Sequence, residues 1–215
     1  MSENSDQIFE WAPLWARVQG LAASIDGSAV VIAADPALSP AQGGAEYVLP
    51  WPGSEGAGMA AAGAAGPGSR LTLVGDDAQG IADFARQNGM GELADRLLLS
   101  APTAEIAQVA SLPDEAQVAS APMDTYDVVE ISLFDHPVCS GRISIGDAAA
   151  VIAGIQADSE EHREAYEPAL LAALAEEAYL HGAGTLYMIA EPERAEGYGN
   201  SGWSVAARVT SFEIA

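Results

Sequence analysis

The spacing of apolar residues predicts helices and short strands in the first half of the chain. Apolar side chains recur every three to four positions in residues 8–22, which predicts an amphipathic helix with its tryptophans in a core. A second helix is predicted over residues 78–88, after an aspartate N-cap in the segment GDDAQG. Four short apolar runs are predicted to be strands: residues 29–33, 45–50, 70–74 and 96–100. Residues 53–69 are almost entirely glycine, alanine and proline, which favours a loop or a frayed helix.

From residue 126 onward the pattern becomes more regular. Three alternating segments predict an antiparallel meander: residues 127–133, 138–145 and 148–157. A charged loop is expected over residues 158–167, followed by a long helix that begins near Pro168, because proline is favoured at the first helical position. Gly182 ends this helix, and the uncharged residues 185–190 predict a buried, parallel strand. No convincing internal repeat is visible.

The charge balance is strongly acidic. The 215 residues include 31 acidic side chains against 8 arginines, with no lysine, and the formal net charge is −23. Such a surface repels phosphate backbones, so we expect no binding of nucleic acid. Two interpretations of the charge stay open: a generally soluble acidic surface, and attraction of a cationic amine substrate.

The remaining compositional features favour a soluble, cytoplasmic protein. No apolar run approaches the roughly 18 residues expected of a membrane span, so we expect no association with a membrane. The N-terminus is polar and acidic, unlike a signal peptide. The lone cysteine, Cys139, has no partner for an internal disulfide, and no spacing of residues suggests a metal site.

The elements from Tyr126 to Val209 resemble, in order and length, the core of the GNAT superfamily of N-acetyltransferases. The most specific part is Ala195-x-x-Tyr198-x-x-x-Gly202-Trp203, which is similar to the A-x-x-Y-x-x-x-G-F element of that family. The resemblance implies an α/β fold with a mixed, mostly antiparallel sheet flanked by helices. It also divides the chain into residues 1–125, an N-terminal region with an extension and the first elements of the fold, and residues 126–215, which carry the acetyl-CoA site.

The resemblance assigns a cofactor site to the second region. In this family the fourth strand pairs with the pantetheine arm of acetyl-CoA, and the loop after it turns backbone amides toward the pyrophosphate. The corresponding residues of the fourth strand are Ile155, Gln156 and Ala157. Those of the loop motif Q/R-x-x-G-x-G/A are His162, Arg163, Glu164, Ala165, Tyr166 and Glu167.

One position suggests catalysis. Tyr198 matches the residue with which many of these enzymes protonate the departing thiolate, although a tyrosine can also serve there only in packing.

The expected loop departs from the family pattern in its charge. Residues 158–167 carry five carboxylates and one arginine, and Glu167 replaces a small residue beside the pyrophosphate. Two functions therefore remain open. The first is transfer of an acetyl group from acetyl-CoA to a primary amine of a small molecule or peptide, without a metal. The second is a catalytically inactive binding or regulatory module that keeps the fold and has lost CoA. A homodimer is compatible with either function.

Overall fold

The computed structural model describes residues 3–33, 44–53, 55–65, 68–108, 112–113 and 115–214. The described helices are α1 (Glu3–Val18), α2 (Glu55–Ala65), α3 (Ala78–Gln87), α4 (Thr103–Ile106), α5 (Glu160–Leu180) and α6 (Pro192–Gly199). The described strands are β1 (Ala22–Asp26), β2 (Ala29–Ala33), β3 (Glu46–Pro50), β4 (Arg70–Gly75), β5 (Gly91–Pro102), β6 (Ala116–Pro122), β7 (Asp127–Leu133), β8 (His136–Ile145), β9 (Ala149–Ala157), β10 (Thr185–Ala190) and β11 (Ser204–Glu213).

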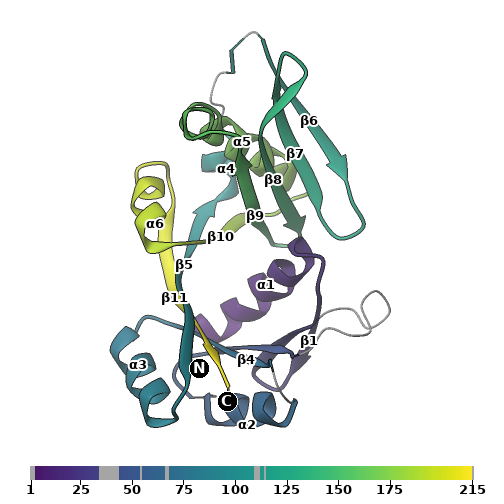
Figure 1. The fold of residues 1–215 in the computed structure, drawn as a ribbon. Helices are drawn as coiled ribbons and strands as arrows, with labels where there is room; N and C mark the ends of the chain where they lie inside the picture. Colours follow the sequence, from purple (N-terminus) through teal and green to yellow (C-terminus); the bar gives the residue numbers. More distant parts are fainter. Residues whose placement is uncertain are drawn as a thin grey trace.

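These strands form one sheet in the order β1-β2-β3-β4-β11-β5-β10-β9-β8-β7-β6 (Figure 1). Neighbouring strands are antiparallel except for two parallel pairs, β3 with β4 and β9 with β10. The predicted α/β fold with a mostly antiparallel sheet is thus confirmed. The division at residue 125 stays a prediction, since strands from both sides of it belong to this sheet.

The two halves of the sheet are built from the same succession of elements. In the first half, three antiparallel strands (β1 to β3) lead through α2 into the parallel strand β4 and then through α3 into β5. In the second half, β7 to β9 lead through α5 into β10 and through α6 into β11. The last strands are exchanged, because β5 pairs with β10 and β11 pairs with β4. The chain therefore contains a structural repeat that its sequence does not reveal.

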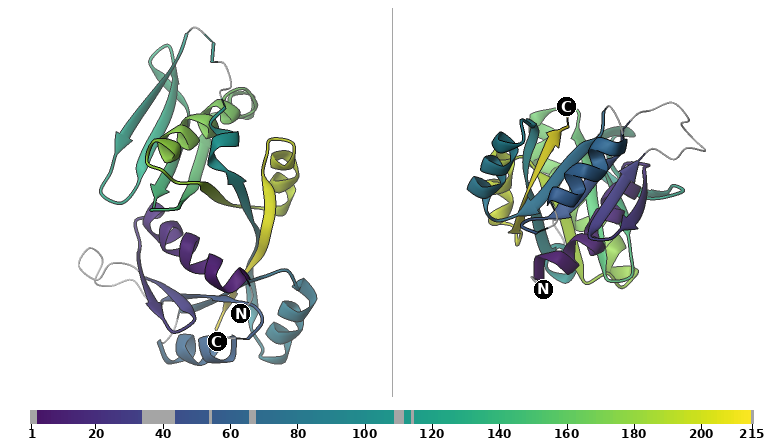
Figure 2. Two further views of the ribbon diagram at one scale, coloured as in Figure 1. Left: turned by 180° about the vertical axis from the view of Figure 1, so that it is seen from behind. Right: turned by 90° about the horizontal axis from the view of Figure 1, so that it is seen from below.

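Helices cover both faces of the sheet, and the alternation of side chains along β9 explains how. Ala150 and Ile152 point into a core shared with α5, whereas Ala149 and Val151 point into a core shared with α1. Figure 2 shows α1 crossing the sheet near its middle. The expected core role of Trp11 is confirmed, since its side chain is fully buried in the α1 core.

Several elements differ in extent from the expectations. The segment 53–69 contains the regular helix α2 where a loop or frayed helix was expected, while residues 54, 66 and 67 lie outside the described residues. Gly58 explains the close packing of α2, because a Cβ atom there would lie 2.5 Å from Leu49 Cδ1. β5 is longer than the predicted strand 96–100, and β1 and β6 were not predicted. No described helix combines the length and the apolarity that a membrane span requires.

Candidate ligand pocket between α5 and α6

Helix α5 begins eight residues earlier than predicted, which changes the candidate site. It starts at Glu160, and Ser159 caps it by accepting a hydrogen bond from the backbone N–H of His162 at 3.1 Å. Pro168 lies inside the helix, not at its start. The prediction of a loop over residues 158–167 is therefore wrong for all but its first two residues. Backbone amides that a loop would turn toward a pyrophosphate lie within the helix instead.

The parallel strands in the second half of the sheet stop pairing before they end. β9 and β10 pair only as far as Ile152 and Met188. Beyond this point β9 continues to Ala157 beside β8 alone, while β10 continues beside β5. In the first half of the sheet the equivalent strands stay paired to Pro50 and Val74, and the Trp51 N–H still donates to the Val74 carbonyl at 2.8 Å. Only the β9/β10 pair therefore separates before its strands end.

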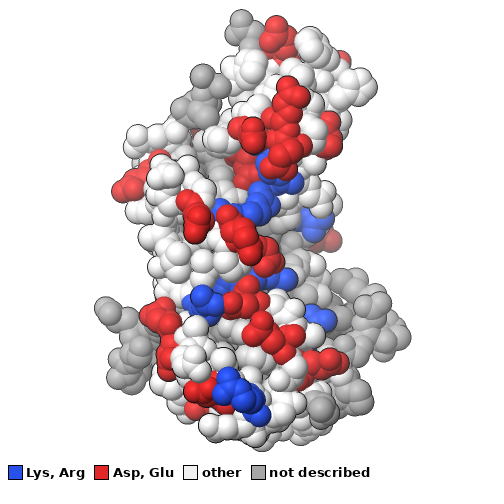
Figure 3. Space-filling model, turned by 60° about the vertical axis from the view of Figure 1, so that its left-hand side comes forward, with Lys and Arg blue, Asp and Glu red and all other residues white. Residues whose placement is uncertain are grey.

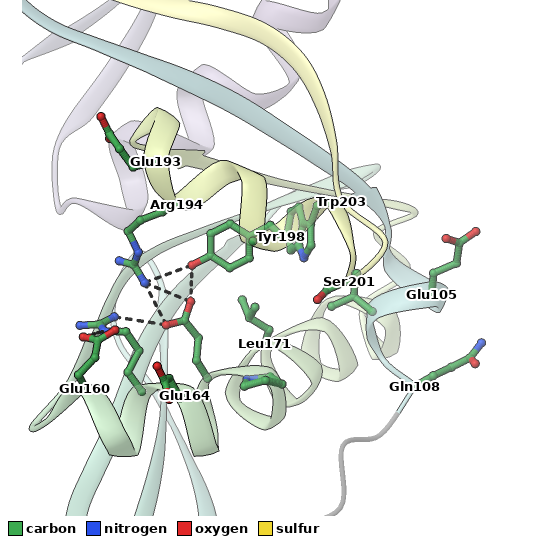
Figure 4. Close-up of a pocket in the computed structure, with 15 residues that line it drawn as sticks. Glu105, Gln108, Glu160, Glu164, Leu171, Glu193, Arg194, Tyr198, Ser201 and Trp203 are labelled. Atoms are coloured by element: carbon green, nitrogen blue, oxygen red, sulfur yellow. Dashed lines mark hydrogen bonds and ion pairs between the residues drawn. The ribbon is translucent and has the colours of Figure 1, made fainter.

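A pocket of about 710 Å³ lies between α4, α5 and α6 (Figure 4). Its apolar wall consists of Ile106, Pro168 and Leu171, and two aromatic rings, Tyr198 and Trp203, line it from the α6 side. These rings meet edge to face, with centroids 6.4 Å apart. Ionisable side chains also line the pocket: Glu105, Glu160, Arg163, Glu164, Glu167, Glu193 and Arg194. Five glutamates and two arginines give this lining a formal charge of −3.

Glu167 is the centre of a buried polar network in this pocket. Its side chain is 9% exposed and accepts hydrogen bonds from Arg163 Nη1 at 3.3 Å and Arg194 Nη2 at 3.0 Å. The Tyr198 hydroxyl donates to Glu167 Oε1. Arg163 also contacts Glu160 at 3.3 Å. In Figure 4, dashed lines mark the interactions by which Arg194 and Tyr198 of α6 reach a carboxylate of α5.

The network raises the pKa of two of its members, Tyr198 and Arg163. Burial raises the pKa of Tyr198, and the hydrogen bond to Glu167 and the charge of that carboxylate raise it further. Burial lowers the pKa of Arg163, but its hydrogen bond to Glu167 and the negative charges nearby outweigh this effect and raise the pKa overall. Tyr198 is therefore a neutral phenol at physiological pH, and its hydroxyl donates to Glu167.

The structure brings only some of the predicted site residues together. The pocket contains four of them, namely Arg163, Glu164, Glu167 and Tyr198. Gln156 and Ala157 line a separate cavity of about 220 Å³ beside Cys139, and Ile155 packs against the core.

The remaining three predicted residues have other surroundings. His162 contacts Asp158 at 2.6 Å and packs against the ring of Tyr166, which is buried in the core. Ala165 lies on an exposed part of α5.

Sequence reasoning missed Arg194, which contributes a guanidinium to the network. This residue lies four positions before Tyr198 on α6, so both side chains share one face of that helix. That spacing is a signal readable from sequence, but the partner Glu167 lies 27 residues away and becomes a neighbour only in the fold.

No protein-family model and no curated protein sequence matches the chain. Solved structures do match it. A GCN5-related N-acetyltransferase from Kribbella flavida superposes with a TM-score of 0.70 at 17% identity, covering 100% of this chain and 96% of the other. The chain has the GNAT fold.

Two further solved structures share the GNAT fold. A tandem GNAT protein from the clavulanic acid biosynthesis pathway has a TM-score of 0.59 at 12% identity, covering 89% of this chain and 81% of the other. A GCN5-related N-acetyltransferase from Sphaerobacter thermophilus has a TM-score of 0.57 at 11% identity, with coverage of 86% and 76%. At these identities the likeness establishes the fold alone.

The GNAT fold implies acetyl-CoA, so the residues at its expected pyrophosphate site must be compared with that group. The positions expected to form the loop are helical, and both arginines already bind Glu167. The first turn of α5 adds two more carboxylates, Glu160 and Glu161. A helix N-terminus favours anions, and Glu160 and Glu161 already place negative charge in this first turn. At the positions where the resemblance placed the pyrophosphate loop, the structure therefore has a helix with carboxylate side chains.

Proposed function

We propose that this protein is a GNAT-fold binding module that does not use acetyl-CoA at the α5–α6 site. The observation that carries this proposal is the buried carboxylate of Glu167, which engages both arginines of the pocket. An anionic ligand bound there would compete with this carboxylate for Arg163 Nη1 and Arg194 Nη2. The protein thus keeps the shape of an acyltransferase, while both arginines that line the described pocket already contact a carboxylate.

Electrostatic magnitudes support this proposal. Two unit charges roughly 4 Å apart interact by about 1 kcal/mol in water and by about 4 kcal/mol at an effective dielectric constant of about 20. A pyrophosphate beside Glu167 would meet that repulsion at a side chain only 9% exposed, where water screens charge poorly. One such contact weakens binding by roughly one to three decades. This loss removes useful affinity for a cofactor that is bound in the micromolar range.

A second candidate function is the transfer of an acetyl group from acetyl-CoA to an amine. Two observations favour it: the separation of β9 from β10 beyond Ile152, and the placement of Tyr198 in the pocket. This function requires Arg163 and Arg194 to leave Glu167 and meet the pyrophosphate. Under it, Tyr198→Phe would lower kcat far more than it weakens CoA binding.

Calorimetric titration of the purified protein with acetyl-CoA, at low and moderate salt, separates the two candidates. The proposal expects no heat of binding at millimolar acetyl-CoA in either buffer. Micromolar binding would refute it and would turn attention to a screen of amine acceptors.

A gain-of-function variant makes this test sharper. The triple variant Glu164→Arg, Ala165→Gly and Glu167→Gly supplies a cation and a backbone able to form a loop, so it should create CoA binding that the native protein lacks. The matched control Glu164→Gln with Glu167→Gln removes the same two carboxylates but keeps the helix-forming side chains. Binding by the control alone would show that charge, and not backbone conformation, excludes the cofactor.

A further inference from the structure

Strand β6 forms one free edge of the sheet. It is the last strand in the order, and within the described residues it pairs with β7 alone. Figure 1 shows β6 on the outside of the upper half, with no described helix along its outer side. Every residue from Gln117 to Pro122 is exposed. The backbone groups on the outer side of β6 are therefore accessible to another chain.

One hydrogen bond at the turn after β6 shows which backbone groups face outward. The Met123 N–H donates to the Tyr126 carbonyl at 2.8 Å, so it points toward β7. The direction of the backbone groups alternates along an antiparallel strand, and the β6–β7 register has no shift. Ala119 therefore also points toward β7. Val118 and Ser120 direct their N–H and C=O groups toward the free edge.

β6 lacks most of the features that protect a strand edge. Natural edges are shielded by charged side chains, bulges, prolines or a very short strand. β6 has seven residues, none of them charged, and its register contains no bulge. Its proline, Pro122, is the last residue of the strand. The donors and acceptors of Val118 and Ser120 are thus left open.

The charges around β6 have one sign. Residues 115–135 contain five carboxylates and no arginine, lysine or histidine. Glu115 and Asp124 flank β6 directly, and both are exposed. Elsewhere arginines lie among the acidic side chains, as on the face in Figure 3. The edge is therefore an uncharged strand with negative charge at each end.

This arrangement disfavours a second copy of the chain as the occupant of the edge. Antiparallel pairing of two β6 strands about Ala119 would bring Glu115 of one copy beside Asp124 of the other. Parallel pairing in register would place each carboxylate beside its own counterpart. Like charges across a strand pair are destabilising. A strand with a cation at each end would instead be attracted.

The side chain of Val118 indicates what the middle of a partner strand would contact. Val118 pairs with Ile131, so the two side chains point to the same face of the sheet. Ile131 is fully buried in the core beneath α5, whereas Val118 is 44% exposed at the margin of that core. An apolar side chain on a strand beside β6 would cover Val118 and extend the core.

We propose that the free edge of β6 binds an extended segment of another protein as a further strand of the sheet. The segment has an uncharged, partly apolar centre and an arginine or lysine at each end. Hydrogen bonds to the backbone of Val118 and Ser120 hold it, and Glu115 and Asp124 select its ends. This surface lies three strands from β9 and goes beyond the proposed function.

Two synthetic peptides test the charge preference. Both have blocked termini and a core of alternating threonine and valine as long as β6, and they carry either arginine or glutamate at both ends. Arginine has no primary amine, so the probe is not an acceptor for acyl transfer. Calorimetry should detect the arginine peptide at millimolar concentration. The glutamate peptide should bind at least roughly tenfold more weakly.

Amide hydrogen exchange measured by NMR locates the bound peptide. In the free protein the N–H groups of Val118 and Ser120 should exchange faster than that of Ala119, which donates to β7. Saturation with the arginine peptide should slow the first two roughly tenfold or more, so that the alternation along β6 disappears.

Variants separate the backbone contacts from the charges. Ser120→Pro removes an outward N–H and spares the β7 ladder, so it should weaken the arginine peptide at least roughly tenfold. Ser120→Ala keeps the N–H and should bind as the native protein does. The double variant Glu115→Gln with Asp124→Asn should narrow the difference between the two peptides. Glu196→Gln, at an exposed position of α6, should leave that difference unchanged.

Several outcomes would overturn the inference. They are no binding of the arginine peptide, equal binding of both peptides, equal affinities in Ser120→Pro and Ser120→Ala, or binding that leaves the exchange of Val118 and Ser120 unchanged. A native dimer that Ser120→Pro converts into a monomer would also overturn it, because a second copy would then occupy the edge. β6 does not line the pocket between α4, α5 and α6, so the titration with acetyl-CoA fails or succeeds separately.

Discussion

Replacing Glu167 by glutamine tests whether the pocket network is a real determinant of stability. The substitution keeps the length and shape of the side chain, so packing around it is preserved. It removes the negative charge that two guanidinium groups and one phenol share. Since the side chain is only 9% exposed, we expect the folded state to lose more than it would at a surface ion pair.

The expected loss of unfolding free energy depends on how exposed the two arginine side chains are. Hydrogen bonds to charged groups contribute about 1.5–3 kcal/mol each, but they do not add when a partner can turn to water. The Arg194 side chain is 44% exposed and that of Arg163 is 23% exposed, so both recover most of their hydration. Glutamine still accepts from Tyr198, though more weakly. We therefore expect a loss of about 1–2 kcal/mol, and about 2–3 kcal/mol for Glu167→Ala, which leaves the phenol unpaired.

The assay is chemical denaturation of the two variants beside Glu164→Gln. Glu164 is an exposed residue of the same helix, so its variant should stay within about 0.5 kcal/mol of the native protein. In thermal unfolding, a loss of 1–2 kcal/mol corresponds to a fall of roughly 2–8 °C for a chain of this size. If Glu167→Gln and Glu164→Gln have equal midpoints, Glu167 is not held by the arginines and the argument against a pyrophosphate collapses.

Three further predictions concern other parts of the molecule. Ser159→Ala should cost about 1 kcal/mol in chemical denaturation, because Ser159 caps α5, and an unchanged midpoint would contradict a helix that starts at Glu160. In α2, Gly58→Ala should destabilise by about 1 kcal/mol through its contact with Leu49, while Gly63→Ala, with open space around it, should be neutral or stabilising; the same sign at both positions would contradict the packing of α2. The raised pKa of Tyr198 means that its neutral form stabilises the fold fully below the unfolded pKa of about 10, and this stability is lost as the pH rises through the folded value. Between the unfolded and the folded pKa of Tyr198, the free energy of unfolding should fall more steeply with pH in the native protein than in Tyr198→Phe. Parallel curves for the two proteins would refute the raised pKa of Tyr198.

Local patterns were sufficient for most of the fold. The alternation from Asp127 to Ala157 gave the meander, because a strand buried on one or both faces must place apolar residues at fixed spacing. The helix predicted over residues 78–88 is also confirmed. Its N-cap is Asp77, whose side chain accepts a hydrogen bond from the Gly80 N–H at 2.8 Å. The repeat is not visible in the sequence because it consists of the order and direction of the strands. Unrelated side chains can form strands with the same topology.

The candidate site was less accessible to sequence reasoning. Two start signals lie within ten residues of each other, Ser159 followed by acidic residues and Pro168, and the helix begins at the first. A proline inside a helix removes one backbone hydrogen bond and its ring clashes with the carbonyl four residues earlier, a cost of about 3 kcal/mol that the tertiary packing of α5 offsets. The role of Glu167 depended on Arg194, whose approach from α6 no local pattern could specify.

The exchange of last strands has a consequence for the order in which the protein can be completed during synthesis. β4 lies between β3 and β11, and β11 is the last strand of the chain. A nascent N-terminal half therefore exposes the open edge of β4 until residues 204–213 have left the ribosome. Exposed strand edges are prone to pairing with other chains, so the early half depends on the late one for protection. If the chain were divided into two halves, the N-terminal half would keep β5, which pairs with β10, and the C-terminal half would keep β11, which pairs with β4.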